Sequence, residues 1–419
     1  MSTRNQYSAE QLEQIRATLK DSLGDDSTTA LDNLNNRFTP GVEAPETEKK
    51  PGRSLSKTGS SLGKVSKIDV EEVIRSGNIT KMLEAVPIVL GEPNKINALI
   101  DALLKNGEVK SFHLVEALGK VHKDKDLVER LVDGIITRKG VNPLVDSLKF
   151  AVISPKAMLD LARSLAEQGT VNHILRAIAG APKGQDEVEI IWTMEVIGKG
   201  TIDQMLDAIK LIETSSPGTV VLATGIVNRK GTSVESMVRA LGAAKENPKA
   251  ATILVVPLVK KMDVPVLISL MEKYLPDKNP ASEIVAAQLV NRCLGHATRS
   301  KELATAIRFA RNETMTAQIL AWGLVKQDKL DQILRGYNRL PSPTMAKKML
   351  AMGVVKMKGK LMSLKELGKA GWDLTSNTAE IAKAMNETQA RYKQILAQYK
   401  LDEDQRKNPG SEGEEEQQA

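Results

Sequence analysis

Apolar and polar positions follow a helical period along this chain, and the pattern itself recurs about every 31 residues. In the segment 79–85, Ile79, Met82 and Leu83 are apolar and the small Ala85 follows them. The same arrangement returns at 171–177, 202–208 and 330–336. Apolar residues at i, i+3 and i+4 form one stripe along an α-helix, and a small residue lets that stripe pack closely on a neighbour. Each recurrence therefore predicts an amphipathic helix.

A second helical pattern follows the first within each repeat. The segments 222–227, 320–325 and 350–355 share a Leu-Ala pair, a glycine two positions later and a final valine. Glycine inside a helix costs about 1 kcal/mol relative to alanine, so its recurrence at one register predicts a close approach of another helix. Between the two helices we expect a turn, and six prolines fall there: Pro182, Pro217, Pro248, Pro280, Pro341 and Pro343.

These recurrences define about nine two-helix repeats, which begin at Gly77, Glu108, Val141, Thr170, Thr201, Thr232, Val264, Ala297 and Lys329. One such hairpin cannot bury its apolar stripe alone, so the hairpins must stack on one another. We therefore predict an all-α protein: an α-solenoid with an extended concave surface, over residues 67–372. The period is shorter than the 34 residues of tetratricopeptide repeats, whose signature is absent, and no named repeat family is identified.

The two ends of the chain differ from the repeats. Residues 8–23 carry one apolar stripe and predict a short amphipathic helix within 1–23. Residues 24–66 are rich in Ser, Thr, Asn, Pro and Gly, and we expect a disordered linker there. We also expect a disordered acidic tail over 402–419.

Residues 373–401 predict a long helix. Its apolar residues alternate spacings of four and three: Ile381, Met385, Thr388, Tyr392, Ile395 and Tyr399. That spacing fits the seam of a coiled-coil dimer, and it equally fits a capping helix that lies over the last repeats. Because the seam contains a threonine and two tyrosines, we favour the cap.

Composition agrees with a helical protein of the cytoplasm. Aromatic residues make up 3% of the chain, and helix packing, unlike sheet packing, needs few of them. The single cysteine excludes an intramolecular disulfide, and the polar, acidic N-terminus is unlike a secretory signal. No stretch approaches the 18 or so apolar residues that a membrane span needs.

No candidate catalytic, cofactor or metal residues are selected. Cys293 lies on an apolar stripe and reads as a core residue, although His296 follows it by three positions. The four histidines are scattered, and Asp124-Lys125-Asp126 lacks the glycine and glutamate that a calcium loop requires. Phosphate-binding glycine loops are absent. We therefore expect no cofactor.

Charge is concentrated towards the end of the repeats. Residues 297–369 hold 15 basic and 5 acidic residues. The candidate anion-binding residues are Arg299, Lys301, Arg308, Arg311, Lys326, Lys329, Arg335, Arg339, Lys347, Lys348, Lys356, Lys358 and Lys360. They favour an anionic partner, or else form a solvated face that the acidic tail partly neutralises.

Three functions remain open. The leading hypothesis is a non-enzymatic scaffold or adaptor whose repeat surface binds a protein partner. The first alternative is an RNA- or DNA-binding solenoid that uses the basic repeats, although base stacking would need more aromatic residues there. The second is an enzyme with a site in the groove. The oligomeric state is not determined by the sequence.

Overall fold

The computed structural model describes residues 68–275, 279–294, 296, 299–310, 314–341, 344–356 and 378–407, with backbone alone at 355, 356, 378 and 400–407. The described chain divides between two compact units, unit 1 (Met1–Leu222) and unit 2 (Ala223–Ala419). The predicted N-terminal helix, the linker and residues 408–419 lie outside the described residues, as do Arg311, Lys358 and Lys360. Residues 402–407 were predicted to belong to the disordered tail, but they continue the last helix.

Unit 1 is built from α-helices joined by short turns. Its described elements are α3 (Val70–Arg75), α4 (Ile79–Ala85), α5 (Pro93–Lys105), α6 (Ser111–Val121), α7 (Lys125–Thr137), α8 (Val141–Ser147), the 3-10 turn η2 (Leu148–Phe150), α9 (Pro155–Gln168), α10 (Val171–Gly180), α11 (Asp186–Lys199) and α12 (Ile202–Leu211). The next helix, α13 (Pro217–Asn228), contains the boundary between the units.

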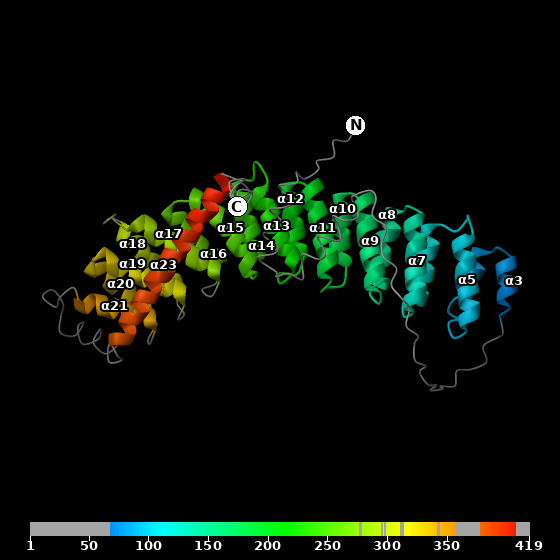
Figure 1. Ribbon diagram of the computed structural model, residues 1–419, viewed down its shortest axis with the longest axis horizontal. Helices are drawn as coiled ribbons and strands as arrows, with labels where there is room; N and C mark the ends of the chain where they lie inside the picture. Colours follow the sequence, from blue (N-terminus) through cyan, green and yellow to red (C-terminus); the bar gives the residue numbers. More distant parts are fainter. Residues whose placement is uncertain are drawn as a thin grey trace, which may run out of the picture. The chain divides into compact units, whose positions relative to one another are not determined.

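Unit 2 continues the same construction (Figure 1). Its described elements are α14 (Val234–Ala244), α15 (Pro248–Lys261), α16 (Val264–Tyr274), α17 (Pro280–Cys293), α18 (Ser300–Ala306), the 3-10 turn η4 (Ile307–Phe309), α19 (Met315–Gln327), α20 (Leu330–Arg339), α21 (Met345–Lys356) and α23 (Thr378–Lys407). The described residues of both units are therefore all-α, as the sequence predicts.

Helices pack in a regular sequential order within each unit. In unit 1, α5, α7, α9 and α11 form one row in which each contacts the next, and α4, α6, α8, α10 and α12 form another. In unit 2, the rows are α15, α17, α19 and α21, and α16, α18 and α20. Each helix thus touches its chain neighbour and the helix two places along, which is the packing of a helical repeat. In each unit we call the row of odd-numbered helices (α5 to α11 in unit 1, α15 to α21 in unit 2) the second row.

The helix boundaries follow from local sequence. The first helix of each predicted repeat begins at the predicted start or within three residues of it, from Ile79 in α4 to Leu330 in α20. Polar residues cap many N-termini; Asp124, for instance, accepts a hydrogen bond from the Leu127 amide at 3.2 Å. Pro217, Pro248 and Pro280 open α13, α15 and α17, where a proline costs no helical hydrogen bond. These three prolines thus follow the predicted turns directly, Pro182 and Pro341 lie between helices, and Pro343 lies outside the described residues.

Long donor side chains join the ends of successive helices in the second row. Arg138 donates to the carbonyl of Leu104 at 2.8 Å, Lys199 to that of Ala166 at 2.5 Å, and Gln327 to that of Cys293 at 2.6 Å. Arg292 donates to the carbonyls of Val259 and Met262 at the end of α15. The last carbonyls of a helix lack intrahelical partners, so each contact satisfies the end of the preceding helix and ties two repeats together.

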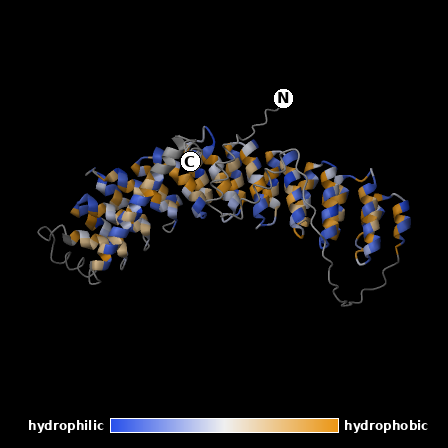
Figure 2. Cartoon of the chain, viewed as in Figure 1, coloured by the Kyte–Doolittle hydropathy of each residue, from blue (hydrophilic) through white to orange (hydrophobic). Residues whose placement is uncertain are grey.

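The helices of the second row in unit 1 and in unit 2 differ in how their polar and apolar residues are distributed. Figure 2 shows α5 and α7 with distinct hydrophilic and hydrophobic sides. By contrast, α19 buries every residue from Ile319 to Leu324, so it has no polar side. A helix that is apolar all round must be covered on every side.

The long helix α23 provides cover in unit 2. It contacts α17, α19 and α21 and runs across them (Figure 1). Ile381, Thr388, Tyr392 and Ile395 of the predicted seam are buried, and Met385 and Tyr399 are half-buried. The seam residues thus pack on helices of the same chain.

None of the helices in the described residues is both long enough and apolar enough to span a bilayer.

Candidate anion-binding surface

The predicted basic residues that the structure describes lie on several different elements. Lys326 is on α19, where its ammonium lies 5.7 Å from the centre of the Trp322 ring. Lys347 is on α21 and lies 4.7 Å from the centre of the Tyr337 ring. Arg299, Lys301 and Lys329 are exposed at or near the starts of α18 and α20. Lys348 is half-buried on α21, and the side chain of Lys356 lies outside the described residues.

Three of the predicted arginines do come together. Arg308 is in η4, and Arg335 and Arg339 are one helical turn apart in α20, which packs on η4. Burial lowers the pKa of the Arg339 guanidinium, and repulsion by the positive charges of Arg335 and Arg308 lowers it further. This repulsion requires the three groups to be close in space. We call them the arginine cluster.

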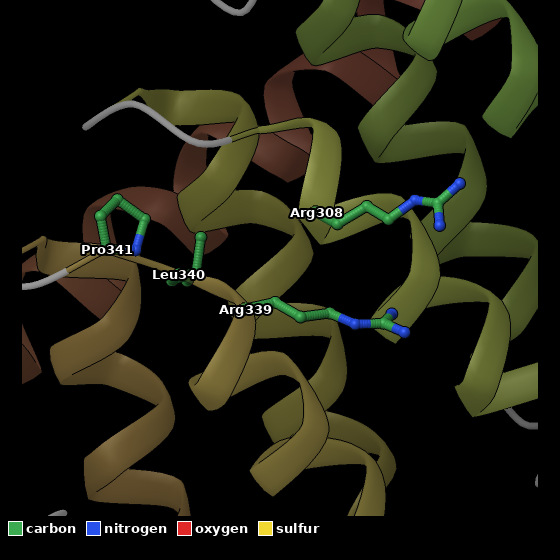
Figure 3. A pocket seen from close by; sticks show the side chains of 4 residues that line it. All are labelled: Arg308, Arg339, Leu340 and Pro341. Carbon is green, nitrogen blue, oxygen red and sulfur yellow. The ribbon is translucent and has the colours of Figure 1, made fainter.

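Two members of the arginine cluster, Arg308 and Arg339, border an open depression of about 540 Å³. Arg308, Arg339, Leu340 and Pro341 line it, and Figure 3 shows the two arginine side chains extended in the same direction. Leu340 and Pro341 follow Arg339 directly, because α20 ends there and the chain turns towards α21. Leu340 is buried and Pro341 is exposed, so the depression combines two guanidinium groups with one exposed apolar side chain.

Each arginine of the depression is held by a neighbouring element. Arg339 donates a hydrogen bond to the carbonyl of Ala304, in the last turn of α18. The Arg308 guanidinium lies 4.3 Å from the centre of the Phe309 ring and 3.8 Å from Glu272 on α16. The Arg308–Glu272 pair is about half exposed, and exposed pairs of this kind stabilise a protein by at most about 1 kcal/mol. The cluster is thus positioned by the fold, and its charge is only weakly compensated by that pair.

An arrangement of this kind suits an anion with two or more oxygens. Guanidinium is planar and always charged at neutral pH, and it donates paired hydrogen bonds to carboxylate or phosphate. An anion in the depression would also relieve the mutual repulsion that lowers the pKa of Arg339.

Two contacts of this site were not predicted from the sequence. Glu272 precedes Arg308 by 36 residues, about one repeat, so charge counting along 297–369 could not reveal it. The Arg339–Ala304 contact joins α20 to α18 across one repeat, just as Lys120 of α6 donates to the carbonyl of Leu83 in α4 at 2.9 Å. A long side chain with a hydrogen-bond donor that recurs near the helix end in each repeat is the sequence signal that could have predicted this contact.

Other candidate chemistry is confined to the core or to turns. Cys293 is fully buried, and burial, followed by the negative charge of Glu302, raises the pKa of its thiol to about 11. The thiol is therefore protonated and inert at neutral pH. Asp124 serves as the N-cap of α7. Within the described residues, no three His, Cys, Asp or Glu side chains are grouped so that they could hold a metal ion.

Comparison with protein-family models, with curated proteins and with solved structures gave no match for this chain.

Proposed function

We propose that this protein is an α-solenoid of about nine hairpins, closed at its C-terminal end by α23, and that it acts as a non-enzymatic scaffold of the cytoplasm. Its proposed activity is to bind an acidic segment of a protein partner at the arginine cluster. The observation that carries the proposal is that Arg308 and Arg339 line one open depression beside the exposed Pro341, with Arg335 near enough for its charge to act on Arg339.

The lack of open aromatic rings near the site favours a peptide over a nucleic acid. Three aromatic residues occur between 299 and 356. Trp322 and Tyr337 are buried, and the ring of Phe309 is covered by the Arg308 guanidinium. Single-stranded nucleic acids gain about 1–3 kcal/mol per base from stacking on open aromatic rings, which these side chains do not offer. A peptide with carboxylates next to an apolar residue matches both the arginines and the exposed Pro341 beside them.

The proposal is tested with a fluorescent glutamate-rich peptide that also contains leucine, titrated with the full chain and followed by anisotropy. We expect the double variant Arg308→Ala/Arg335→Ala to bind at least about tenfold more weakly, since one lining guanidinium and one neighbouring positive charge are lost. Arg339 is left intact because it also holds α18. The matched control removes two exposed charges from unit 1, Lys81→Ala/Lys123→Ala, and should bind as the wild type does.

The alternative is tested in the same titration with a single-stranded RNA of 20 nucleotides. Tighter binding of the RNA than of the peptide, lost in the Arg308→Ala/Arg335→Ala variant and falling steeply with salt, would favour the nucleic-acid hypothesis. Equal peptide binding by the variant and the control would show that the arginine cluster is not the site.

A further inference from the structure

The face of unit 2 that α23 covers has the character of a binding surface. Its helices α17 and α19 are buried almost all round: α17 from Val285 to Val290, and α19 from Ile319 to Leu324. The described residues of α21 are similarly buried from Met349 to Val354. An apolar face of this kind, flanked by polar residues, is what an amphipathic helix recognises when it docks into a groove.

The contacts of α23 resemble those of a docked helix. It buries one stripe, Ile381, Ala384, Thr388, Tyr392 and Ile395. The ring of Tyr392 lies 4.8 Å from that of Trp322. A few polar contacts fix its position along the face.

Those polar contacts are specific. Both Nε and Nη2 of Arg391 lie 3.0 Å from a carboxylate oxygen of Glu283 on α17. The Thr388 hydroxyl lies 3.2 Å from the side-chain oxygen of Gln318 on α19, and it also donates to the Ala384 carbonyl at 2.7 Å. Opposite charges and matched polar groups set the register of a helix in a groove without adding much affinity.

The fit of α23 is incomplete. Its buried stripe has Thr388 at the centre, where a hydroxyl replaces the apolar atoms that a leucine would add. Near its C-terminal end, an open depression of about 330 Å³ remains between α15, α17 and α23. Val256, Ile284, Ile395 and Tyr399 are among the residues that line this depression. A helix with larger apolar residues at these positions would bury more surface, at roughly 25 cal/mol per Å².

Because α23 belongs to the same chain as the face, it acts as an intramolecular ligand of that face. The 21 residues 357–377 separate α21 from α23 in the sequence. Such a ligand is held by its contacts together with its effective concentration, so a partner helix displaces it only when its own contacts are better.

We propose that the face formed by α17, α19 and α21 is a docking surface for an amphipathic helix of a partner protein, and that α23 occupies this surface in the free chain. The partner's helix carries apolar residues at the spacings of 381, 388, 392 and 395, and a basic residue that pairs with Glu283. This surface is separate from the arginine cluster, so each proposal can fail without the other.

The test uses the full chain and a labelled synthetic peptide of residues 378–407 as the probe, with anisotropy as the readout. The variant Arg391→Glu loosens α23 by placing two carboxylates together, while leaving the face itself unchanged. We expect the wild-type chain to bind the peptide weakly and the variant to bind it at least about tenfold more tightly, a change of about 1.4 kcal/mol. The second loosening variant, Ile395→Ser, should act in the same direction, because it removes a buried contact of α23.

The control is Lys393→Glu, which makes the same charge change on an exposed position of α23 and should bind as the wild type does. A peptide carrying Arg391→Glu should lose affinity for the Arg391→Glu chain, because it also places a carboxylate against Glu283. Equal, weak binding by the loosened and control chains, with unchanged helix content by circular dichroism, overturns the proposal and makes α23 a permanent part of the fold. If the loosened chain instead dimerises with rising concentration and the peptide dissolves the dimer, the occupant is a second copy of this chain, which also overturns it.

Discussion

Close helix packing in the second row depends on single glycines. A Cβ added to Gly323 of α19 would lie 2.5 Å from a methyl carbon of Val290 on α17. A Cβ on Gly353 of α21 would lie 2.7 Å from a methyl carbon of Val325 on α19. The recurring glycine predicted such an approach from the sequence alone, and at these two positions the prediction is confirmed.

The variant Gly323→Ala should destabilise the protein although alanine is the better helix former. Alanine gains about 1 kcal/mol of helix propensity, whereas forcing a methyl group into a packed contact costs about 1–3 kcal/mol. We expect a net loss of about 1 kcal/mol, measured as a lower denaturant midpoint. In Gly180→Ala, the added Cβ at the end of α10 meets no atom within 4 Å, so stability should be unchanged or slightly higher.

The same site allows a double-mutant test. Val290→Ala removes the methyl groups that oppose Gly323, so the double variant Gly323→Ala/Val290→Ala should be more stable than the two single losses predict. Simple additivity would show that the contact with Val290 is not the cause.

At the scale of the helices, local sequence predicts ends better than it predicts partners. Caps and prolines act within a few residues, which is why the predicted starts agree with those of α4 to α20. The contact of Arg292 with the carbonyls of α15 and that of Arg308 with Glu272 each join residues about 30 or more positions apart. The partners of these side chains depend on how successive repeats stack on one another, and no local sequence pattern predicts that stacking.

Loss of such a long-range donor should loosen the end of the preceding helix. Arg292→Ala leaves the carbonyls of Val259 and Met262 without the guanidinium that they accept from. Hydrogen bonds to charged groups contribute about 1.5–3 kcal/mol, so we expect a loss of that order. Hydrogen exchange by mass spectrometry should rise at the C-terminal end of α15. In Lys301→Ala, which changes an exposed lysine of α18, exchange at α15 should stay at the wild-type level.

The basic segment shows the same limit of sequence analysis. Counting charges over 297–369 includes Arg308 and Arg339, which line the depression, and Arg335, whose charge acts on Arg339. It also includes Lys326 and Lys347, which lie against aromatic rings on α19 and α20. Net charge along the chain does not distinguish the two rows of helices, because each repeat contributes one helix to each row.

At the scale of the whole molecule, contacts between elements are local in sequence. Apart from those of α23, the packing pairs described above join helices that are at most two places apart within a unit. Repeat proteins with contacts of this kind behave as a sum of repeat and neighbour-interface terms, so unfolding can begin in one part without the rest. The chain should therefore lose structure in stages.

A cavity placed in one unit tests this expectation. Leu99→Ala removes a fully buried side chain of α5, and Leu320→Ala does the same in α19. Each should cost about 2–5 kcal/mol of local stability. By hydrogen exchange, Leu99→Ala should lower protection in α3 to α7 and leave α19 and α21 near the wild-type level, and Leu320→Ala should produce the reverse. If both variants lower protection uniformly over the whole chain, unfolding is a single cooperative transition, and the local contact pattern does not set how this protein opens.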